Sequence, residues 1–116
     1  MAKVKVYHNP RCTKSRNSLI FLDEKGISYD VHLYLQDSLK HDDLKNILTQ
    51  LGMTPQELLR KNETVFKEQF KGKKLTDDQW IEAMIKYPKL MERPIVVRGN
   101  KAVVARPTEK INELFD

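Results

Sequence analysis

Cys12 is the only cysteine of the chain, and it stands in the polar and basic stretch YHNPRCTKSRNS, residues 7–18. The stretch follows an apolar run and precedes the first turn of an expected helix. The free N–H groups and partial positive charge of a helix N-terminus favour anions and can lower the pKa of a thiol from about 8.5. A lone cysteine more often serves as a small core residue, but its neighbours here are polar. We therefore interpret Cys12 as a reactive thiolate.

Basic side chains and a histidine surround this cysteine in the sequence. Arg11, Lys14 and Arg16 place fixed positive charge near the thiol. Two interpretations of His8 stay open at this point: it contributes a hydrogen bond or a charge to the thiol, or it packs at the end of a strand.

The same stretch excludes some kinds of chemistry. A dithiol oxidoreductase would carry a second cysteine at position 15, where this chain has Ser15. Any bond that Cys12 makes must therefore be resolved by a thiol from another molecule. No metal site of the Cys/His type can be assembled with the usual ligand spacing, and we expect neither a metal nor a bound cofactor.

A second candidate feature is a pair of arginines near the end of the chain. Two apolar runs flank Gly99-Asn100, which is typical of a two-residue hairpin turn. Continued along the strands, that register sets Arg93 opposite Arg106, although opposed like charges repel. Either the side chains splay into water, or their planar guanidinium groups hold an oxyanion. Pro94 opens the first of these strands, where a missing N–H is tolerated and a cis peptide bond can occur.

The elements that must position these residues begin with a strand over residues 3–7 and a helix over 13–25. Gly26 is placed to end that helix in a left-handed conformation. A second strand is expected over residues 28–35. This strand–helix–strand order predicts a βαβ unit with two parallel strands, whose carboxyl ends are where ligands bind.

The middle of the chain is expected to be helical. Helical spacing or capping signals mark residues 41–52, 54–61 and 76–88, and residues 67–74 are expected to form a loop. Two capping boxes support the second and third helices: Thr54 with Glu57, and Thr76 with Gln79.

The hairpin and a short closing helix complete the expected fold. That helix starts at Thr108, with Ile111, Leu114 and Phe115 facing inward. The order βαβ, helical insertion, ββα predicts an α/β protein with a thioredoxin-like fold and a mixed four-stranded sheet. We expect one domain over 1–116, with halves at 1–36 and 92–116 and the insertion at 37–91.

Composition narrows the class of protein. With 116 residues, 40% of them hydrophobic and 32% charged, the chain has the size and make-up of one soluble domain. Its net charge of +5 is modest, and its few aromatics lie within apolar patterns, which disfavours nucleic acid as a partner. The N-terminus does not read as a secretory signal, and no apolar stretch is long enough for a membrane helix. We expect a cytoplasmic monomer that acts on a small anion and contacts no membrane.

Five motifs now stand in order along residues 4–115: HNPRCTKSRN, LLRKN, TDDQ, RPIVV and ARP. Together they resemble the ArsC-type arsenate reductases of bacteria, which are linked to glutaredoxin and have a thioredoxin fold. The resemblance identifies Pro94 with the cis-proline of that fold. One departure is that Thr13 and Lys14 stand where the best-known members have glycine and threonine.

The resemblance implies a role for six residues. The nucleophile corresponds to Cys12, the histidine that helps to activate it to His8, and the serine that supports the thiolate to Ser15. Three arginines that bind the oxyanion correspond to Arg60, Arg93 and Arg106.

The resemblance also implies a reaction that detoxifies arsenic. The Cys12 thiolate attacks arsenate, glutathione joins the adduct as co-substrate, and glutaredoxin supplies the electrons that release arsenite. Two alternatives stay open. One is a glutathione-dependent reductase of another oxyanion or of a protein mixed disulfide. The other is a regulator similar to Spx, which binds RNA polymerase; Spx proteins often carry a Cys-x-x-Cys switch, which Ser15 excludes here.

Overall fold

A computed structural model of the chain describes residues 3–115, and its contacts divide the chain into two compact units. The first unit joins the chain up to Asp37 to the chain from Arg93 onward, and the second holds Ser38–Glu92. The prediction that 1–116 form a single domain stays a prediction.

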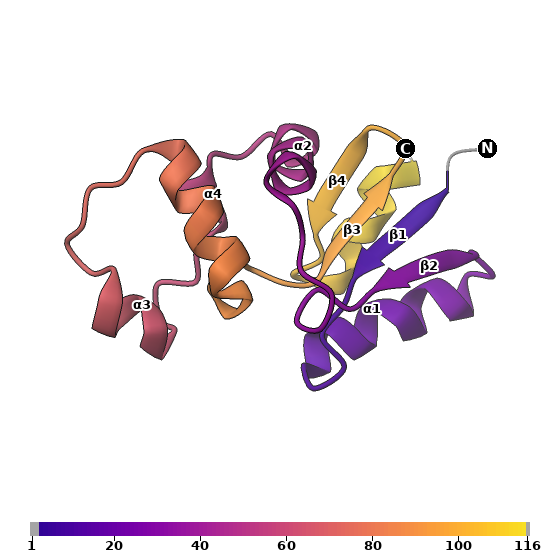
Figure 1. Cartoon of the computed structure of the whole chain (residues 1–116). Coiled ribbons are helices and arrows are strands. Elements are labelled where there is room, and N and C mark those ends of the chain that lie inside the picture. The colour runs from indigo at the N-terminus through magenta and orange to yellow at the C-terminus, as the bar shows by residue number, and fades with distance from the viewer. Residues whose placement is uncertain (1–2, 116) are drawn as a thin grey trace. The chain divides into compact units, whose positions relative to one another are not determined.

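The first unit is built on a mixed four-stranded sheet. Its strands are β1 (Val4–Tyr7), β2 (Tyr29–His32), β3 (Ile95–Arg98) and β4 (Lys101–Val104). Their order is β2-β1-β3-β4, with β1 parallel to β2 and the other neighbours antiparallel (Figure 1). This is the α/β, thioredoxin-like arrangement that the sequence predicts.

The second strand is shorter than expected. β2 ends at His32 rather than at residue 35, because the chain turns there: the Tyr34 N–H donates to the His32 carbonyl at 3.1 Å, and the Asp37 N–H to the Leu33 carbonyl at 2.8 Å. The hairpin has the expected turn, with Arg98 opposite Lys101 on either side of it.

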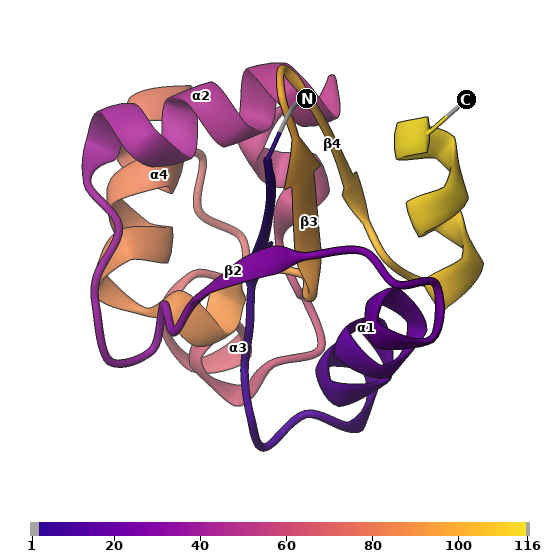
Figure 2. The same cartoon turned by 90° about the vertical axis from the view of Figure 1, so that its right-hand side faces the viewer.

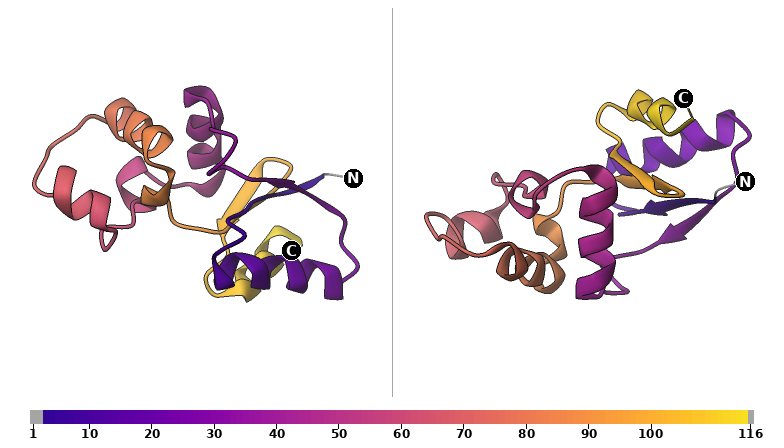
Figure 3. Two further views of the ribbon diagram at one scale, coloured as in Figure 1. Left: turned by 60° about the horizontal axis from the view of Figure 1, so that its bottom comes forward. Right: turned by 90° about the horizontal axis from the view of Figure 1, so that it is seen from above.

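Two helices, α1 (Thr13–Glu24) and η3 (Thr108–Phe115, a 3-10 helix), cover one face of this sheet (Figure 3). α1 ends before Gly26, whose φ of 69° gives the left-handed conformation that was expected. The buried residues between these helices and the sheet form one apolar core: Val4, Val6, Leu22, Val96, Ala105, Ile111 and Leu114.

The prediction that Phe115 faces inward is wrong. Its side chain is 39% exposed, and the Arg98 guanidinium lies 4.6 Å from the centre of its ring. The same guanidinium donates a hydrogen bond to the Leu114 carbonyl at 2.9 Å. A cation over the ring offsets the cost of leaving this aromatic residue at the surface.

The second unit is helical, as expected for the middle of the chain. Figure 2 shows α2 beside α4 in this unit. Its elements are α2 (His41–Leu51), η1 (Pro55–Leu58), α3 (Thr64–Gln69), α4 (Asp77–Lys86) and η2 (Pro88–Leu90). Gly52 ends α2 with a φ of 68°, and both expected capping boxes are present. Within residues 3–115, no helix has the length and apolar character needed to cross a membrane.

Two predictions for this unit need correction. The helix expected over 54–61 is only the 3-10 turn η1, because the backbone becomes extended at Leu59 and forms an isolated bridge with Met91. The loop expected over 67–74 begins inside α3. Phe66 and Phe70 pack against Trp80 of α4, and their ring centres lie 6.3 and 5.8 Å from that of Trp80. This tertiary contact stabilises a helix that lacks a strong local signal.

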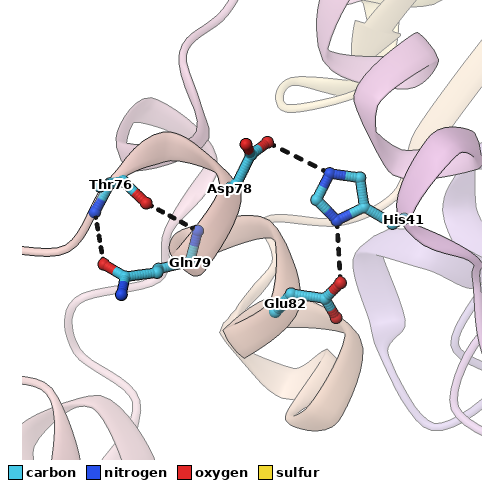
Figure 4. Close-up of polar contacts among 5 residues, drawn as sticks. All are labelled: His41, Thr76, Asp78, Gln79 and Glu82. Atoms are coloured by element: carbon cyan, nitrogen blue, oxygen red, sulfur yellow. Dashed lines mark hydrogen bonds and ion pairs between the residues drawn. The ribbon is translucent and has the colours of Figure 1, made fainter.

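His41 links the start of α2 to α4 (Figure 4). Its Nδ1 lies 2.9 Å from an oxygen of Glu82, and its Nε2 lies 3.2 Å from an oxygen of Asp78. A carboxylate only accepts hydrogen bonds, so both nitrogens donate when the ring is protonated. The hydrogen bond to Glu82 raises the pKa of His41, and Asp78 raises it further, against the lowering effect of burial.

We expect the free energy of unfolding to fall as the pH rises through the raised pKa of His41. The group is fully charged in both states below its unfolded pKa of about 6.5, so its contribution is complete there and is lost at higher pH. Urea denaturation between about pH 6 and pH 9, followed by the fluorescence of Trp80, measures this fall.

Asp78→Asn should reduce this pH dependence, with Glu82 still in contact with His41, whereas the matched variant Asp77→Asn should keep it in full. Both remove an acid from the first turn of α4, but the contact to His41 comes from Asp78. Equal pH profiles for the two variants would contradict the assignment.

Candidate functional site

Cys12 ends the loop that connects β1 to α1 and is the N-cap residue of that helix. Its backbone is extended, with φ −96° and ψ 121°, and its side chain is only 8% exposed. The thiol is therefore at the strand-to-helix junction that the sequence predicts, and it is more buried than its polar neighbours in the sequence suggest.

Asn9 fixes the short loop that carries the thiol. Its side-chain oxygen accepts a hydrogen bond from the Arg11 N–H at 3.0 Å, and its carbonyl accepts one from the Cys12 N–H at 3.0 Å. The Arg16 N–H then donates to the Cys12 carbonyl at 3.0 Å, which is the first turn of α1. The backbone on both sides of Cys12 is held before any ligand arrives.

The surroundings of the thiol favour its charged form. Burial by itself raises the pKa of Cys12, but the Ser15 N–H, the charge and hydrogen bond of Arg93, and the Lys14 N–H together lower it below its usual value. The two N–H groups belong to the first turn of α1, where they have no partner within the helix. This electrostatic setting favours the thiolate, which is the nucleophilic form of cysteine.

His8 and Ser15 form a buried pair beneath the loop. His8 Nδ1 lies 2.7 Å from Ser15 Oγ, and that oxygen also accepts a hydrogen bond from the Asn9 N–H at 3.0 Å. Both residues are buried, with exposed fractions of 5% and 0%. Burial lowers the pKa of His8, and the charge of Arg16 lowers it further, which favours the neutral imidazole. The neutral His8 ring therefore hydrogen-bonds Ser15, which lies in the first turn of α1.

The expected hairpin register is confirmed along β3 and β4, but the ladder does not extend as far as Arg93 and Arg106. The β3–β4 ladder ends at the pair Ile95–Val104, so the two arginines are not an opposed pair within it. They are nevertheless neighbours, because the Arg106 Nε–H donates to the Arg93 carbonyl at 2.7 Å. The peptide bond before Pro94 is cis, as the family resemblance implies, and the bond before Pro107 is cis as well.

Part of the Arg93 guanidinium has no hydrogen-bond acceptor among the described residues. One part of it hydrogen-bonds the Cys12 thiolate, whereas its Nε and Nη1 are buried and have no hydrogen-bond acceptor among residues 3–115. A buried N–H without an acceptor is costly, and a charged one more so. Such a group next to a nucleophile is suited to bind an anion.

Arg60 belongs to the second unit. Its guanidinium makes an ion pair with Glu63 at 3.1 Å and donates to the Lys89 carbonyl at 3.3 Å. The structure thus brings together Cys12, His8, Ser15, Arg93 and Arg106 within the first unit, and the role of Arg60 stays a prediction. Within residues 3–115, no three His, Cys, Asp or Glu side chains gather as a metal ion would require.

Sequence reasoning missed the part that Asn9 and Arg16 play in holding the loop. The signal for Asn9 was its place at the end of an expected strand, because asparagine side chains there accept from the backbone two residues on. Arg16 was counted only as a positive charge, and its side-chain contacts could not be read from the sequence.

Known proteins match this chain over nearly its full length. The uncharacterized protein YfgD of Escherichia coli is 44% identical over 114 residues, which cover 97% of this chain and 96% of that protein. The arsenate reductase of Neisseria meningitidis is 38% identical over 117 residues, covering 99% of this chain and all of that one. The solved structure of the arsenate reductase from Vibrio cholerae superposes with a TM-score of 0.92 at 40% identity, over 97% and 98% of the two chains.

The model of the ArsC family matches residues 7–114, which span the thiol loop, the whole second unit and both arginine–proline pairs. Since relatives also match over nearly the full length of this chain, the protein belongs to the ArsC family.

Proposed function

We propose that this protein is an arsenate reductase whose nucleophile is the Cys12 thiolate. One observation carries the proposal: the thiol whose pKa is lowered by Ser15, Arg93 and Lys14 lies beside a guanidinium with buried, unpaired N–H groups. A thiolate and an oxyanion-binding cation are the two parts that the reaction needs. Relatives named arsenate reductase, from Neisseria meningitidis and Vibrio cholerae, support arsenate as the oxyanion.

In the first step the Cys12 sulfur attacks arsenic and one arsenate oxygen leaves as water, which forms a sulfur–arsenic(V) bond. Arg93 and Arg106 neutralise the remaining oxygens, because planar guanidinium groups match tetrahedral oxyanions. The family resemblance adds Arg60 as a third cation. His8 favours its neutral form and hydrogen-bonds Ser15, and this contact holds the first turn of α1 next to the reacting sulfur.

The electrons come from outside the chain, since no second cysteine is present to resolve the adduct. Glutathione condenses with the adduct and releases a second water. A glutaredoxin thiol then attacks the glutathione sulfur and forms a mixed disulfide, while the electron pair of the sulfur–arsenic bond reduces As(V) to As(III). Water cleaves the remaining bond to Cys12, which releases arsenite and restores the thiolate.

Phosphate has the shape and charge of arsenate and should therefore occupy the same site as a competitor. Thiols do not reduce phosphorus(V), so the later steps cannot follow. In this proposal the reaction itself, rather than binding, separates the two anions.

Cys12→Ser should abolish arsenate-dependent NADPH oxidation in an assay with glutathione, glutaredoxin and glutathione reductase. A hydroxyl in place of the thiolate cannot form the sulfur–arsenic bond. Circular dichroism should show an unchanged fold. Activity retained by the folded variant would rule out the mechanism.

Arg93→Lys should lower kcat/KM for arsenate by roughly tenfold or more. The charge is kept, but the planar fork is lost, and a hydrogen bond to a charged group is worth about 1.5–3 kcal/mol. The matched control is Arg98→Lys, at the end of β3, where the guanidinium contacts Leu114 and Phe115 instead. Equal effects of the two variants would remove Arg93 from the site.

The rate of Cys12 alkylation by iodoacetamide should rise with pH around a midpoint below about 8.5, because only the thiolate reacts. Arg93→Gln should move that midpoint upward and slow alkylation near pH 6.5 roughly tenfold, since a nearby opposite charge shifts a pKa by about one unit or more. A midpoint at the usual value in the unchanged protein would contradict the proposed activation.

A further inference from the structure

The side chain of Arg16 reaches back from α1 and bridges the chain on both sides of Cys12. Its Nη1 donates to the Pro10 carbonyl at 2.9 Å, and its Nη2 donates to the Thr13 hydroxyl at 3.1 Å. Pro10 precedes the thiol and Thr13 follows it. One guanidinium therefore joins the loop that ends β1 to the first residue of the helix.

This bridge depends on the geometry of arginine. Thr13 and Arg16 are three residues apart in α1 and so lie on the same face of the helix. The planar fork of a guanidinium can donate to two acceptors at once, whereas a lysine ammonium on the same stem is a point charge without that fork. A residue without a hydroxyl at position 13 would leave the second donor without its acceptor.

The positive charge of Arg16 is unfavourable for the helix that carries it. A cation near the N-terminus of a helix is unfavourable for the helix itself, because that end already carries partial positive charge. The first turn of α1 holds no acidic residue that could offset the charge of Arg16. The same charge lowers the pKa of the buried His8, after burial itself. The charge of Arg16 therefore destabilises the helix N-terminus but favours the neutral form of His8.

The loop is held on two sides by successive helix residues. On the buried side the Asn9 N–H donates to Ser15 Oγ, and on the exposed side Arg16 holds Pro10 and Thr13. With both contacts in place, the N–H groups of Lys14 and Ser15 stay directed at the sulfur. Loss of the outer contact would let the loop move and weaken these hydrogen bonds to the thiolate.

We propose that Arg16 is a positioning residue for the Cys12 nucleophile, with Thr13 as the anchor that its guanidinium requires. It acts by fixing the thiol over the N-terminus of α1 rather than by touching the substrate. The proposal uses the part of the proposed function that makes Cys12 a nucleophile, and it does not depend on the identity of the oxyanion.

The test is a double-mutant cycle of Arg16→Gln and Thr13→Val, read from the pH dependence of Cys12 alkylation by iodoacetamide. Each single variant should raise the midpoint and slow alkylation near pH 6.5 by roughly two- to tenfold, the effect of one or two hydrogen bonds. Thr13→Val should add no further change in the chain that already carries Arg16→Gln, because both remove the same bridge. Thr13→Ser, which keeps the hydroxyl, should behave like the unchanged protein.

Arg11→Gln is the matched control for charge. It removes one positive charge next to Cys12 but neither of the side-chain contacts made by Arg16. Equal shifts for Arg11→Gln and Arg16→Gln, with no shift for Thr13→Val, would overturn the proposal, because Arg16 would then act by charge alone. If Arg16→Gln does not fold, Arg16→Lys replaces it in the cycle, and an effect of Thr13→Val that persists beside Arg16→Lys would equally overturn the proposal.

The alkylation assay contains no arsenate, so its outcome is separate from that of the coupled assay. A bridge effect on alkylation without any arsenate turnover would leave the positioning role intact and refute the proposed function. Arsenate turnover that depends on Cys12 but not on Thr13 or Arg16 would refute the positioning role and leave the proposed function intact.

Discussion

The antiparallel pairing of β1 with β3 is the constraint on which the site depends. Its register sets Tyr7 opposite Ile95, so the end of one strand lies beside the start of the other. The residues that follow Tyr7 lead to Cys12, and those that precede Ile95 include Arg93. A cation from the far end of the chain thereby meets a thiol from its beginning. The core beneath the sheet, closed by α1 and η3, keeps this register because a slip of one residue would turn Val6 and Val96 out of it.

The same buried environment favours a neutral form of His8 and a charged form of Cys12. Burial disfavours charge on both Cys12 and His8. For His8 it is the largest effect, and it lowers the pKa so that the neutral form is favoured. For the cysteine, the helix N–H groups and Arg93 outweigh burial and favour the anion. The difference lies in the partners: His8 faces the hydroxyl of Ser15, whereas the thiol faces backbone N–H groups and a guanidinium. The result is a charged nucleophile supported by an uncharged pair.

Local signals predicted most of the fold, because they depend on residues close together in the sequence. The Thr76–Gln79 capping box, the end of α2 at Gly52 and the Gly99-Asn100 turn are all of this kind. The pairing of Arg93 with Arg106 was extended past Pro94, beyond the last ladder pair, Ile95–Val104. α3 was not predicted, because its stability comes from contacts of Phe66 and Phe70 with Trp80 rather than from helical spacing or capping signals in its own sequence. In the site, Cys12 could be found from its neighbours alone, whereas Arg60 entered only through resemblance.

The position of Arg93 suits a reaction in which negative charge moves from sulfur to oxygen. In the free protein this guanidinium hydrogen-bonds the thiolate, while its Nε and Nη1 remain buried without an acceptor. In the proposed first step the sulfur loses its charge as it bonds to arsenic, and the charge of the adduct rests on the arsenate oxygens. The donors that have no acceptor in the free protein then gain one, so the interaction is stronger after attack than before it. Interactions that strengthen along the reaction lower its barrier, whereas those that are equal throughout do not.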